Sequence, residues 1–147
     1  MEVTDFRHRF PMSVRWGDLD AYGHVNNVNY FRFLESARVA YMTEGLGLTI
    51  RAEGENIILA DAQCRFISQL TFPQELEIFT RISRVGRSSL ITDQIILRAG
   101  ESAPAAQATC VLVWFDFERQ LSSPLPSELR ERLAQYEHIM PEGVLMR

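Results

Sequence analysis

The sequence predicts a single α+β domain in which an antiparallel sheet encloses one long helix, and three observations carry this prediction. One helical pattern is followed by four strand-like segments without a long helical pattern between them, which favours hairpin connections. The helix carries apolar residues around most of its circumference, so we expect it to be enclosed. The chain has 147 residues, of which 46% are hydrophobic and 23% charged, and this fits one globular domain spanning 1–147.

The first expected element is a strand within residues 6–16. Phe10, Met12 and Val14 alternate with other residues, as in a strand with one buried face. Pro11 lacks an N–H group, so this strand is expected at a sheet edge or at a bulge. A polar, turn-rich loop follows over residues 17–27.

The expected helix covers residues 28–45 and has apolar residues at 30, 33, 34, 37, 40 and 41, the spacing of an amphipathic helix. Gly45 and Gly47 are expected to end it. Phe31, Val39 and Met42 lie outside this stripe, and they are the reason to expect an enclosed helix.

Strands are expected near 56–68, 75–84, 89–98 and 105–117, separated by Pro73, the turn 85–87 and the loop 100–104. Apolar residues point to both faces of the last strand, and one helix covers only one face. We therefore expect a homo-oligomer. A short C-terminal helical cap is expected at about 126–137, opened by Pro126 and Ser127.

Charge and composition exclude several function classes. The formal charge of −4 argues against nucleic-acid binding, which depends on clustered Lys and Arg. Charged residues within Met1–Phe10 leave no apolar stretch for a signal peptide or membrane span, so a cytoplasmic location is expected and no membrane partner. The two cysteines and three histidines lack metal-ligand spacing, and neither a metal nor a cofactor is expected.

The segment Arg15–Tyr30, RWGDLDAYGHVNNVNY, resembles the signature of the 4-hydroxybenzoyl-CoA thioesterase family. The order of the expected elements extends this resemblance to about residue 120. The resemblance implies a hot-dog fold, an antiparallel sheet wrapped around a long central helix in the order β-α-β-β-β-β, here followed by a short C-terminal helix. It also implies an acyl-CoA thioesterase, which hydrolyses an acyl-CoA substrate to a free acid and CoA.

Hydrolysis of a thioester requires a nucleophile or base beside the carbonyl carbon, and donors aimed at the carbonyl oxygen. Backbone N–H groups at a helix N-terminus are such donors. The resemblance matches Asp20 to the catalytic carboxylate, which attacks the carbonyl directly or activates a water. It places the polarising backbone N–H at Asn27, in the first turn of the helix. Asp18 is expected to make loop hydrogen bonds instead.

Five further residues are candidates for supporting roles in this site: Gly23, His24, Asn26, Tyr30 and Glu35. His24 is either a base or a packed, hydrogen-bonded side chain. Tyr30 is expected to hold the start of the helix. Glu35 is either a second catalytic acid, as in other hot-dog branches, or an acid that faces solvent or another subunit.

The hairpin turn around residue 86 is the candidate site for the phosphorylated end of CoA. It combines Arg84, Gly86, Arg87, Ser88 and Ser89, which suit phosphate and pantetheine contacts. The resemblance implies that a neighbouring subunit often supplies this hairpin. The same residues also form an ordinary β-turn.

Three other functions fit parts of the pattern. A hot-dog hydroxyacyl dehydratase needs a His and an acid across the tunnel, and the loop spacing of Asp20 and His24 does not resemble that arrangement. A non-catalytic acyl-CoA-binding protein would not need Asp20. A phosphatase with a D-x-D motif needs an α/β alternation that is missing here. Both a dimer and a tetramer of hot-dog dimers remain open.

Overall fold

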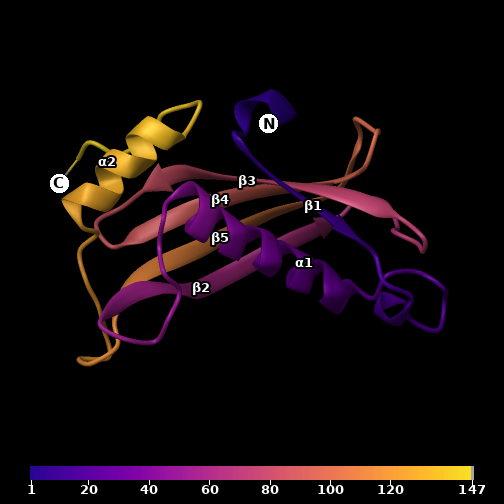
Figure 1. Cartoon of the computed structure of the whole chain (residues 1–147), viewed down its shortest axis with the longest axis horizontal. Coiled ribbons are helices and arrows are strands. Elements are labelled where there is room, and N and C mark those ends of the chain that lie inside the picture. The colour runs from indigo at the N-terminus through magenta and orange to yellow at the C-terminus, as the bar shows by residue number, and fades with distance from the viewer. Residues whose placement is uncertain (147) are drawn as a thin grey trace.

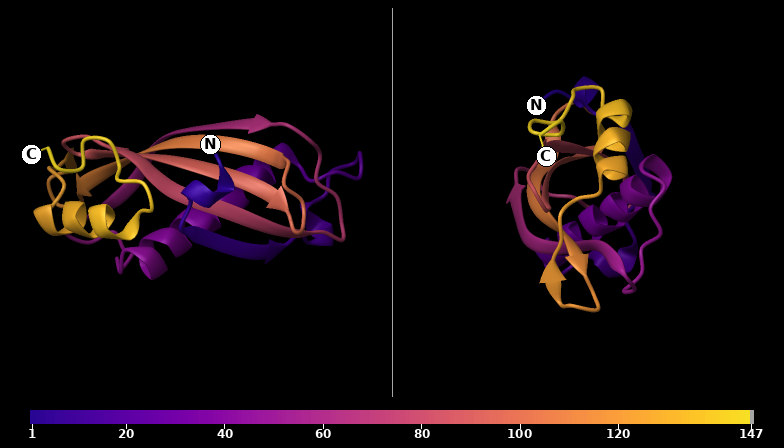
Figure 2. Two further views of the ribbon diagram at one scale, coloured as in Figure 1. Left: turned by 90° about the horizontal axis from the view of Figure 1, so that it is seen from above. Right: turned by 90° about the vertical axis from the view of Figure 1, so that its left-hand side faces the viewer.

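The computed structural model describes residues 1–146, and their strands form one curled antiparallel sheet around helix α1 (Figure 1). The strand order in the sheet is β1-β3-β4-β5-β2, and β6 pairs with β5. The curved sheet holds α1 against one of its faces (Figure 2), so the predicted fold class is confirmed. The elements are β1 (His8–Ser13), α1 (Asn27–Ala40), β2 (Glu55–Phe66), β3 (Glu75–Val85), β4 (Ser89–Arg98), β5 (Pro104–Asp116), β6 (Leu121–Ser122) and α2 (Ser127–Tyr136).

The two edges of this sheet are β1 and β2. Pro11 lies in β1, opposite Glu77 of β3, so the missing N–H is accommodated at an edge as expected. Strand β2 is long and pairs only with β5, with a register shift between Leu59 and Asp61. Its other side is free of strand partners among residues 1–146.

Helix α1 is less enclosed in the single chain than its sequence predicts. Tyr30, Leu34 and Ala37 are buried against the sheet, whereas Phe31 and Val39 are 37% and 43% exposed. The sheet covers one side of the helix, and residues 1–146 cover the side that carries these two residues only in part. The helix also continues beyond Ala40 into one π-helical turn, Tyr41–Gly45, and Gly47 follows with a positive φ of 68°.

A buried polar layer divides the core under α1 into two apolar clusters. One cluster includes Leu34, Ile78 and Ala108, and the other includes Tyr41 and Ile82. Polar residues of α1 and of the same sheet face lie between the two clusters, and each is at most 7% exposed. The weakly polar Cys110, 1% exposed, belongs to the same layer. The layer consists of His8, Arg38, Thr80, Thr92, Gln94 and Cys110.

The other face of the sheet is covered only in part. Phe6, in the N-terminal segment, packs on Phe79, Ile95 and Leu97 of that face. Helix α2 packs Leu129 and Leu133 at one end of the core instead. No helix among residues 1–146 is long and apolar enough to cross a membrane.

His8 has an unfavourable position in the polar layer. Its ring lies against Tyr41, with centroids 5.7 Å apart, and neither ring nitrogen makes a hydrogen bond to the described residues. Its Nε2 is 3.6 Å from a carboxylate oxygen of Glu44, which is largely exposed. Burial lowers the pKa of His8 below 6.5, and Glu44 opposes this effect only in part.

This position of His8 predicts a loss of stability in mild acid. Unfolded His8 takes up a proton below about pH 6.5, but folded His8 resists protonation because its pKa is lowered. The free energy of unfolding therefore falls as the pH drops below 6.5 toward the lowered pKa of the folded state. Urea denaturation at about pH 7.5 and about pH 5.5 measures this.

His8→Phe is expected to reduce this dependence on pH, whereas replacing the exposed His138 by Gln leaves it unchanged. The prediction is wrong if the wild-type protein and His8→Phe lose the same stability between the two pH values.

Candidate active site

The loop before α1 is fixed by hydrogen bonds to Asp18. This carboxylate is buried and accepts the backbone N–H of Arg15 at 2.7 Å and its guanidinium at 3.2 Å. The Asp18 carbonyl accepts the Asn26 N–H at 3.0 Å and the Asn29 side-chain amide at 2.9 Å. Asp18 therefore has the loop-stabilising role expected from the sequence.

Asp20 lies in a tight turn that leaves much of its carboxylate free. Its Oδ1 accepts the Tyr22 N–H at 2.9 Å and the His24 N–H at 3.5 Å. Its own N–H donates to the His24 carbonyl at 2.8 Å. Gly23 has a φ of 79°, which the turn requires and which a side chain would strain. Oδ2 of Asp20 makes no hydrogen bond to the described residues, so it is available to a substrate or a water.

Helix α1 begins with a side-chain cap from Asn26. Its Oδ1 accepts the Val28 N–H at 3.0 Å, and its carbonyl accepts the Asn29 N–H at 2.8 Å. The N–H of Asn27 donates to no described residue. A free N–H in the first turn of a helix is a donor for an anionic oxygen, strengthened by the helix dipole.

Tyr30 connects the first turns of α1 to the segment that follows β2. Its hydroxyl donates to the Ser68 carbonyl at 3.3 Å and accepts the Leu70 N–H at 3.2 Å. Burial raises the pKa of Tyr30 above 10.0, so the hydroxyl keeps the proton that it donates. The ring also packs edge-on against Phe66 at 5.0 Å. The predicted role of Tyr30 in holding the helix start agrees with these contacts.

These elements enclose a cavity of about 320 Å³ beside the helix start. It brings together four of the predicted residues, Asp20, His24, Asn27 and Tyr30. The remaining wall residues were not among the predicted site residues. Tyr22 and Val25 lie in the same loop as Asp20, whereas Phe66, Ile67, Ser68 and Gln69 come from another part of the chain and carry no motif.

Glu35 lies outside this cavity. Eight residues separate it from Asn27 along α1, a rise of about 12 Å. It is exposed, pairs with Arg32 at 3.3 Å, and lines a second cavity that also contains Arg38. A single chain therefore does not place Glu35 beside Asp20.

The hairpin predicted to bind CoA lies at the other end of the molecule from Asp20 (Figure 1). Strand β3 begins near the loop, where the Val14 N–H donates to the Gln74 carbonyl, and its eleven residues extend roughly 35 Å to the hairpin. One chain thus separates the two predicted sites. Together they serve one substrate only if the hairpin comes from another copy.

The C-terminal segment engages part of this hairpin. Arg84 pairs with Glu142 at 3.0 Å, and the Val85 N–H donates to the Glu142 carbonyl. The Gly86 N–H donates to the Ser89 carbonyl, as in an ordinary turn. Arg87 and Ser88 have no side-chain bond to the described residues, so the hairpin's role in binding CoA stays a prediction.

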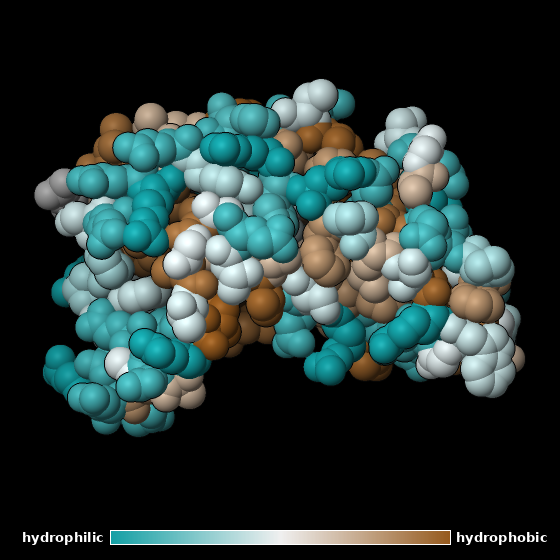
Figure 3. Space-filling view, viewed as in Figure 1, coloured by the Kyte–Doolittle hydropathy of each residue, from teal (hydrophilic) through white to brown (hydrophobic). Residues whose placement is uncertain are grey.

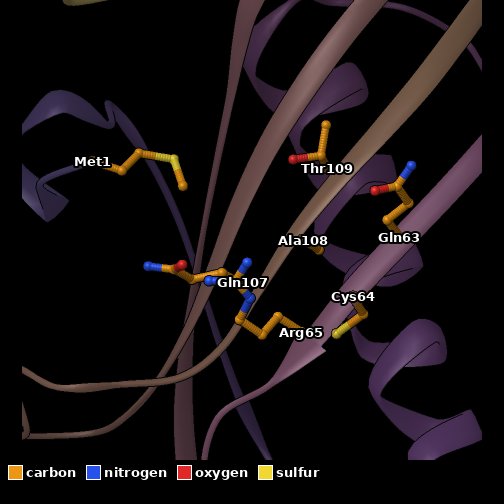
Figure 4. Close-up of a pocket in the computed structure, with 7 residues that line it drawn as sticks. All are labelled: Met1, Gln63, Cys64, Arg65, Gln107, Ala108 and Thr109. Atoms are coloured by element: carbon orange, nitrogen blue, oxygen red, sulfur yellow. The ribbon is translucent and has the colours of Figure 1, made fainter.

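A further cavity of about 340 Å³ lies on the sheet face opposite α1 (Figure 4). Gln63 and Arg65 of β2 and Gln107 and Thr109 of β5 line it, with Met1 beside them. Cys64 also borders it, and burial raises the pKa of this thiol to about 11, so it is not a thiolate at neutral pH. No cluster of residues suited to hold a metal occurs among residues 1–146.

Comparison with known proteins agrees with this geometry. A family model described as "Thioesterase-like superfamily" matches residues 14–133. The long-chain acyl-CoA thioesterase FadM of Escherichia coli is 28% identical over 84% of this chain and 95% of its own. The uncharacterised protein YsmA of Bacillus subtilis is 33% identical over 59% of this chain, and this match spans only 58% of YsmA.

Two solved structures share the fold over nearly their whole length. The PA5185 protein of Pseudomonas aeruginosa has a TM-score of 0.84 and 31% identity, with 92% of this chain and 95% of that chain covered. A thioesterase from Thermus thermophilus, solved with coenzyme A and Zn, has a TM-score of 0.76 and 29% identity, with 92% and 97% covered.

The two hydrogen bonds of Tyr30 predict that Tyr30→Phe destabilises the protein. The variant removes the only acceptor of the Leu70 N–H among the described residues, and Leu70 is fully buried. An unsatisfied buried donor costs about 1–3 kcal/mol, so the free energy of unfolding in urea is expected to fall by about that amount. Tyr22→Phe is the matched control, because Tyr22 is 86% exposed and its hydroxyl makes no hydrogen bond to the described residues. Equal stability of the two variants would contradict the prediction.

Proposed function

The chain belongs to the thioesterase-like superfamily, and from this premise we propose that it hydrolyses an acyl-CoA thioester to a free acid and CoA, with Asp20 as its catalytic carboxylate. The membership confirms the predicted enzyme class, a thioester hydrolase, at the level of the superfamily. The narrower 4-hydroxybenzoyl-CoA branch stays a prediction. The observation that carries the proposal is one cavity that contains both the free edge of Asp20 and the start of α1.

In the proposed reaction, the substrate carbonyl enters the cavity with its oxygen toward the Asn27 N–H. Negative charge develops on this oxygen as the carbonyl carbon is attacked, and the N–H and the helix dipole stabilise it. Oδ2 of Asp20 either attacks the carbon to form a mixed anhydride or removes a proton from an attacking water. Both routes expel the CoA thiolate. Attack by a water releases the acid directly, whereas the mixed anhydride releases the acid and regenerates Asp20 only after a water hydrolyses it.

CoA is the proposed carrier of the acyl group for two reasons. FadM, which is similar along most of this chain, is named for acyl-CoA, and the structure from Thermus thermophilus contains coenzyme A. A dehydratase would need a His and an acid on opposite sides of a tunnel, whereas Asp20 and His24 here share one turn. We therefore retain hydrolysis as the reaction.

Asp20→Asn is expected to lower kcat by at least about 100-fold. The amide oxygen of Asn still accepts the Tyr22 N–H, so the turn and the fold are retained. The loss therefore reflects chemistry, measured by release of free thiol from a panel of short, medium, long and aromatic acyl-CoAs. Circular dichroism verifies that the variant is folded.

Two control variants sharpen this experiment. Glu131→Gln removes an exposed acid of α2 and is expected to leave turnover unchanged. Asn27→Ala is expected to keep most of the activity, because the proposed donor is the backbone N–H. Near-normal turnover of Asp20→Asn would remove Asp20 from the mechanism.

We further propose that the protein is a homo-oligomer built on the free edge of β2. The surface between α1 and β2 carries an apolar strip, and Figure 3 shows hydrophobic surface in brown over the middle of this face. Exposed fractions in this α1–β2 strip range from 37% to 49%, which is unusual for large apolar side chains that lie together. The strip consists of Phe31, Val39, Ile50, Leu59, Phe66 and Ile67.

Antiparallel pairing of two β2 strands about the bulge at Asp61 would cover this strip. A two-fold axis near the middle of β2 places the Ile57 end of one strand beside the Arg65 end of the other. The cavity that contains Glu35 in one copy then lies beside Phe66, which borders the Asp20 cavity of its partner. The partner would thus supply Glu35, which a single chain keeps away from Asp20.

Light scattering is expected to give the mass of two or four chains for the wild-type protein. Val39→Asp places a charge in the α1–β2 strip and is expected to shift the mass toward that of one chain. Leu121→Asp, on β6 and 55% exposed, serves as the control and should leave the mass unchanged. A folded, active monomer at working concentration would refute the oligomer.

A further inference from the structure

The second cavity beside α1 contains a buried arginine whose charge no carboxylate compensates. Arg38 is 7% exposed, and no carboxylate of residues 1–146 lies within ion-pair distance of it. Its Nη1 donates to the Gln94 Oε1 at 3.2 Å and contacts the Cys110 Sγ at 3.4 Å. These neutral partners position the guanidinium without neutralising it.

Two other well-buried arginines among residues 1–146 are compensated differently. Arg81 pairs with Asp93 at 3.2 Å. Arg130, also 7% exposed, donates to backbone carbonyls that include those of Gly143 and Gly86. A buried cation without such partners costs several kcal/mol, so the Arg38 site is an expensive feature of the fold.

Two side-chain nitrogens of Arg38 have unused donors. Its Nε and Nη2 make no hydrogen bond to the described residues. Both atoms nevertheless retain some accessible surface. In this they differ from the fully buried, unpaired atoms among the described residues, which are the two ring nitrogens of His8 and Oε2 of Glu137. Arg38 therefore has two nitrogens with unused donors and lines this cavity.

The rest of the cavity wall is apolar except for Glu35, whose carboxylate pairs with Arg32. Its volume is about 160 Å³, close to that of a protein cavity that holds one benzene molecule. An apolar wall with one buried cation suits a hydrocarbon group that carries an oxygen. The apolar residues are Val39, Met42, Ile50, Ile57, Ile58, Leu59 and Leu112.

We propose that Arg38 is a specificity-determining residue that selects acyl groups bearing an oxygen acceptor, a carboxylate or a hydroxyl, at the end remote from the thioester. This inference rests on the proposed thioesterase activity and names the class of its acyl substrate. The apolar wall takes the hydrocarbon part, and Nε and Nη2 donate to the terminal oxygen. Such a hydrogen bond from a charged donor is stronger than one between neutral groups.

The Arg38 cavity and the Asp20 cavity are both lined by residues of α1. Within one chain, Arg38 lies eleven residues beyond Asn27 on α1, a rise of about 16 Å. In the proposed β2 pairing, the Arg38 cavity of one copy borders the Asp20 cavity of the other. Both arrangements put Arg38 at the far end of an acyl group and away from the thioester.

The test compares hydrolysis of matched acyl-CoAs of six to twelve carbons, unsubstituted, ω-hydroxylated and ω-carboxylated. The wild-type protein is expected to prefer an oxygenated member at its best chain length. Loss of a charged hydrogen bond corresponds to about a tenfold effect or more, so Arg38→Met should lower the ratio of oxygenated to plain kcat/KM by at least that factor. Arg38→Lys keeps the charge and should retain part of the preference for the carboxylate. Arg119→Gln, in the exposed turn after β5, is the control.

Three results decide the proposal. A ratio that stays the same in folded Arg38→Met, or a wild-type preference for plain chains at every length, overturns it. If Arg38→Met does not fold, Arg38→Gln takes its place with the same expected loss of preference. If the wild-type protein hydrolyses none of the thioesters, the proposed function fails, and calorimetry with the free mono- and dicarboxylic acids decides the role of Arg38. Preferential binding of the diacid that Arg38→Gln abolishes supports that role, and equal binding refutes it.

Discussion

The hydrogen bonds that hold the first turn of α1 against the segment 68–70 determine where the candidate site can form. Tyr30 ties the helix to Ser68 and Leu70, and the Leu70 carbonyl also accepts the Val25 N–H at 2.8 Å. Asp18 fixes the other end of the same loop. Hydrogen bonds therefore fix both ends of the loop that contains Asp20. They also fix the position of the free Asn27 N–H relative to the Asp20 carboxylate. Preorganised donors of this kind act on a developing charge without a reorganisation cost.

The polar layer in the core has a different physical basis. Thr80, Thr92 and Gln94 are fully buried and hydrogen-bonded, so their desolvation is offset. His8 and Arg38 are not compensated to the same degree. Replacing these two residues by apolar side chains of equal volume would leave the core at least as stable. Stability therefore accounts for the hydrogen-bonded residues of the layer but not for His8 and Arg38. Arg38 has unused donors and lines a cavity, and this separates a ligand-binding role from a purely structural one.

The sequence predicted the order and nearly the exact bounds of the main elements, because these depend on local periodicity and turn residues. From Pro11 it also predicted that β1 lies at an edge or carries a bulge, and β1 lies at an edge. Neither the residues 66–69 in the site wall nor the inward position of Arg38 was predictable in this way. The position of residues 66–69 follows from the pairing of β2 with β5. The position of Arg38 follows from the packing of α1 on β4, more than fifty residues away. Contacts over such distances leave no pattern in the local sequence. The separation of the hairpin at Gly86 from Asp20 likewise follows from the direction of β3 and not from any motif.

The apolar residues of α1 connect the fold to its proposed assembly. The helix sequence predicts enclosure on nearly all sides, yet one sheet covers only the side with Leu34 and Ala37. Phe31 and Val39 are then partly exposed to solvent next to the unpaired edge of β2, a combination that favours association through this edge. Such an assembly buries the exposed side of α1 and completes pairing along β2. It also brings Glu35 and the Arg38 cavity of one copy to the Asp20 cavity of the next, so the same contact that satisfies the helix joins the separated halves of the candidate site.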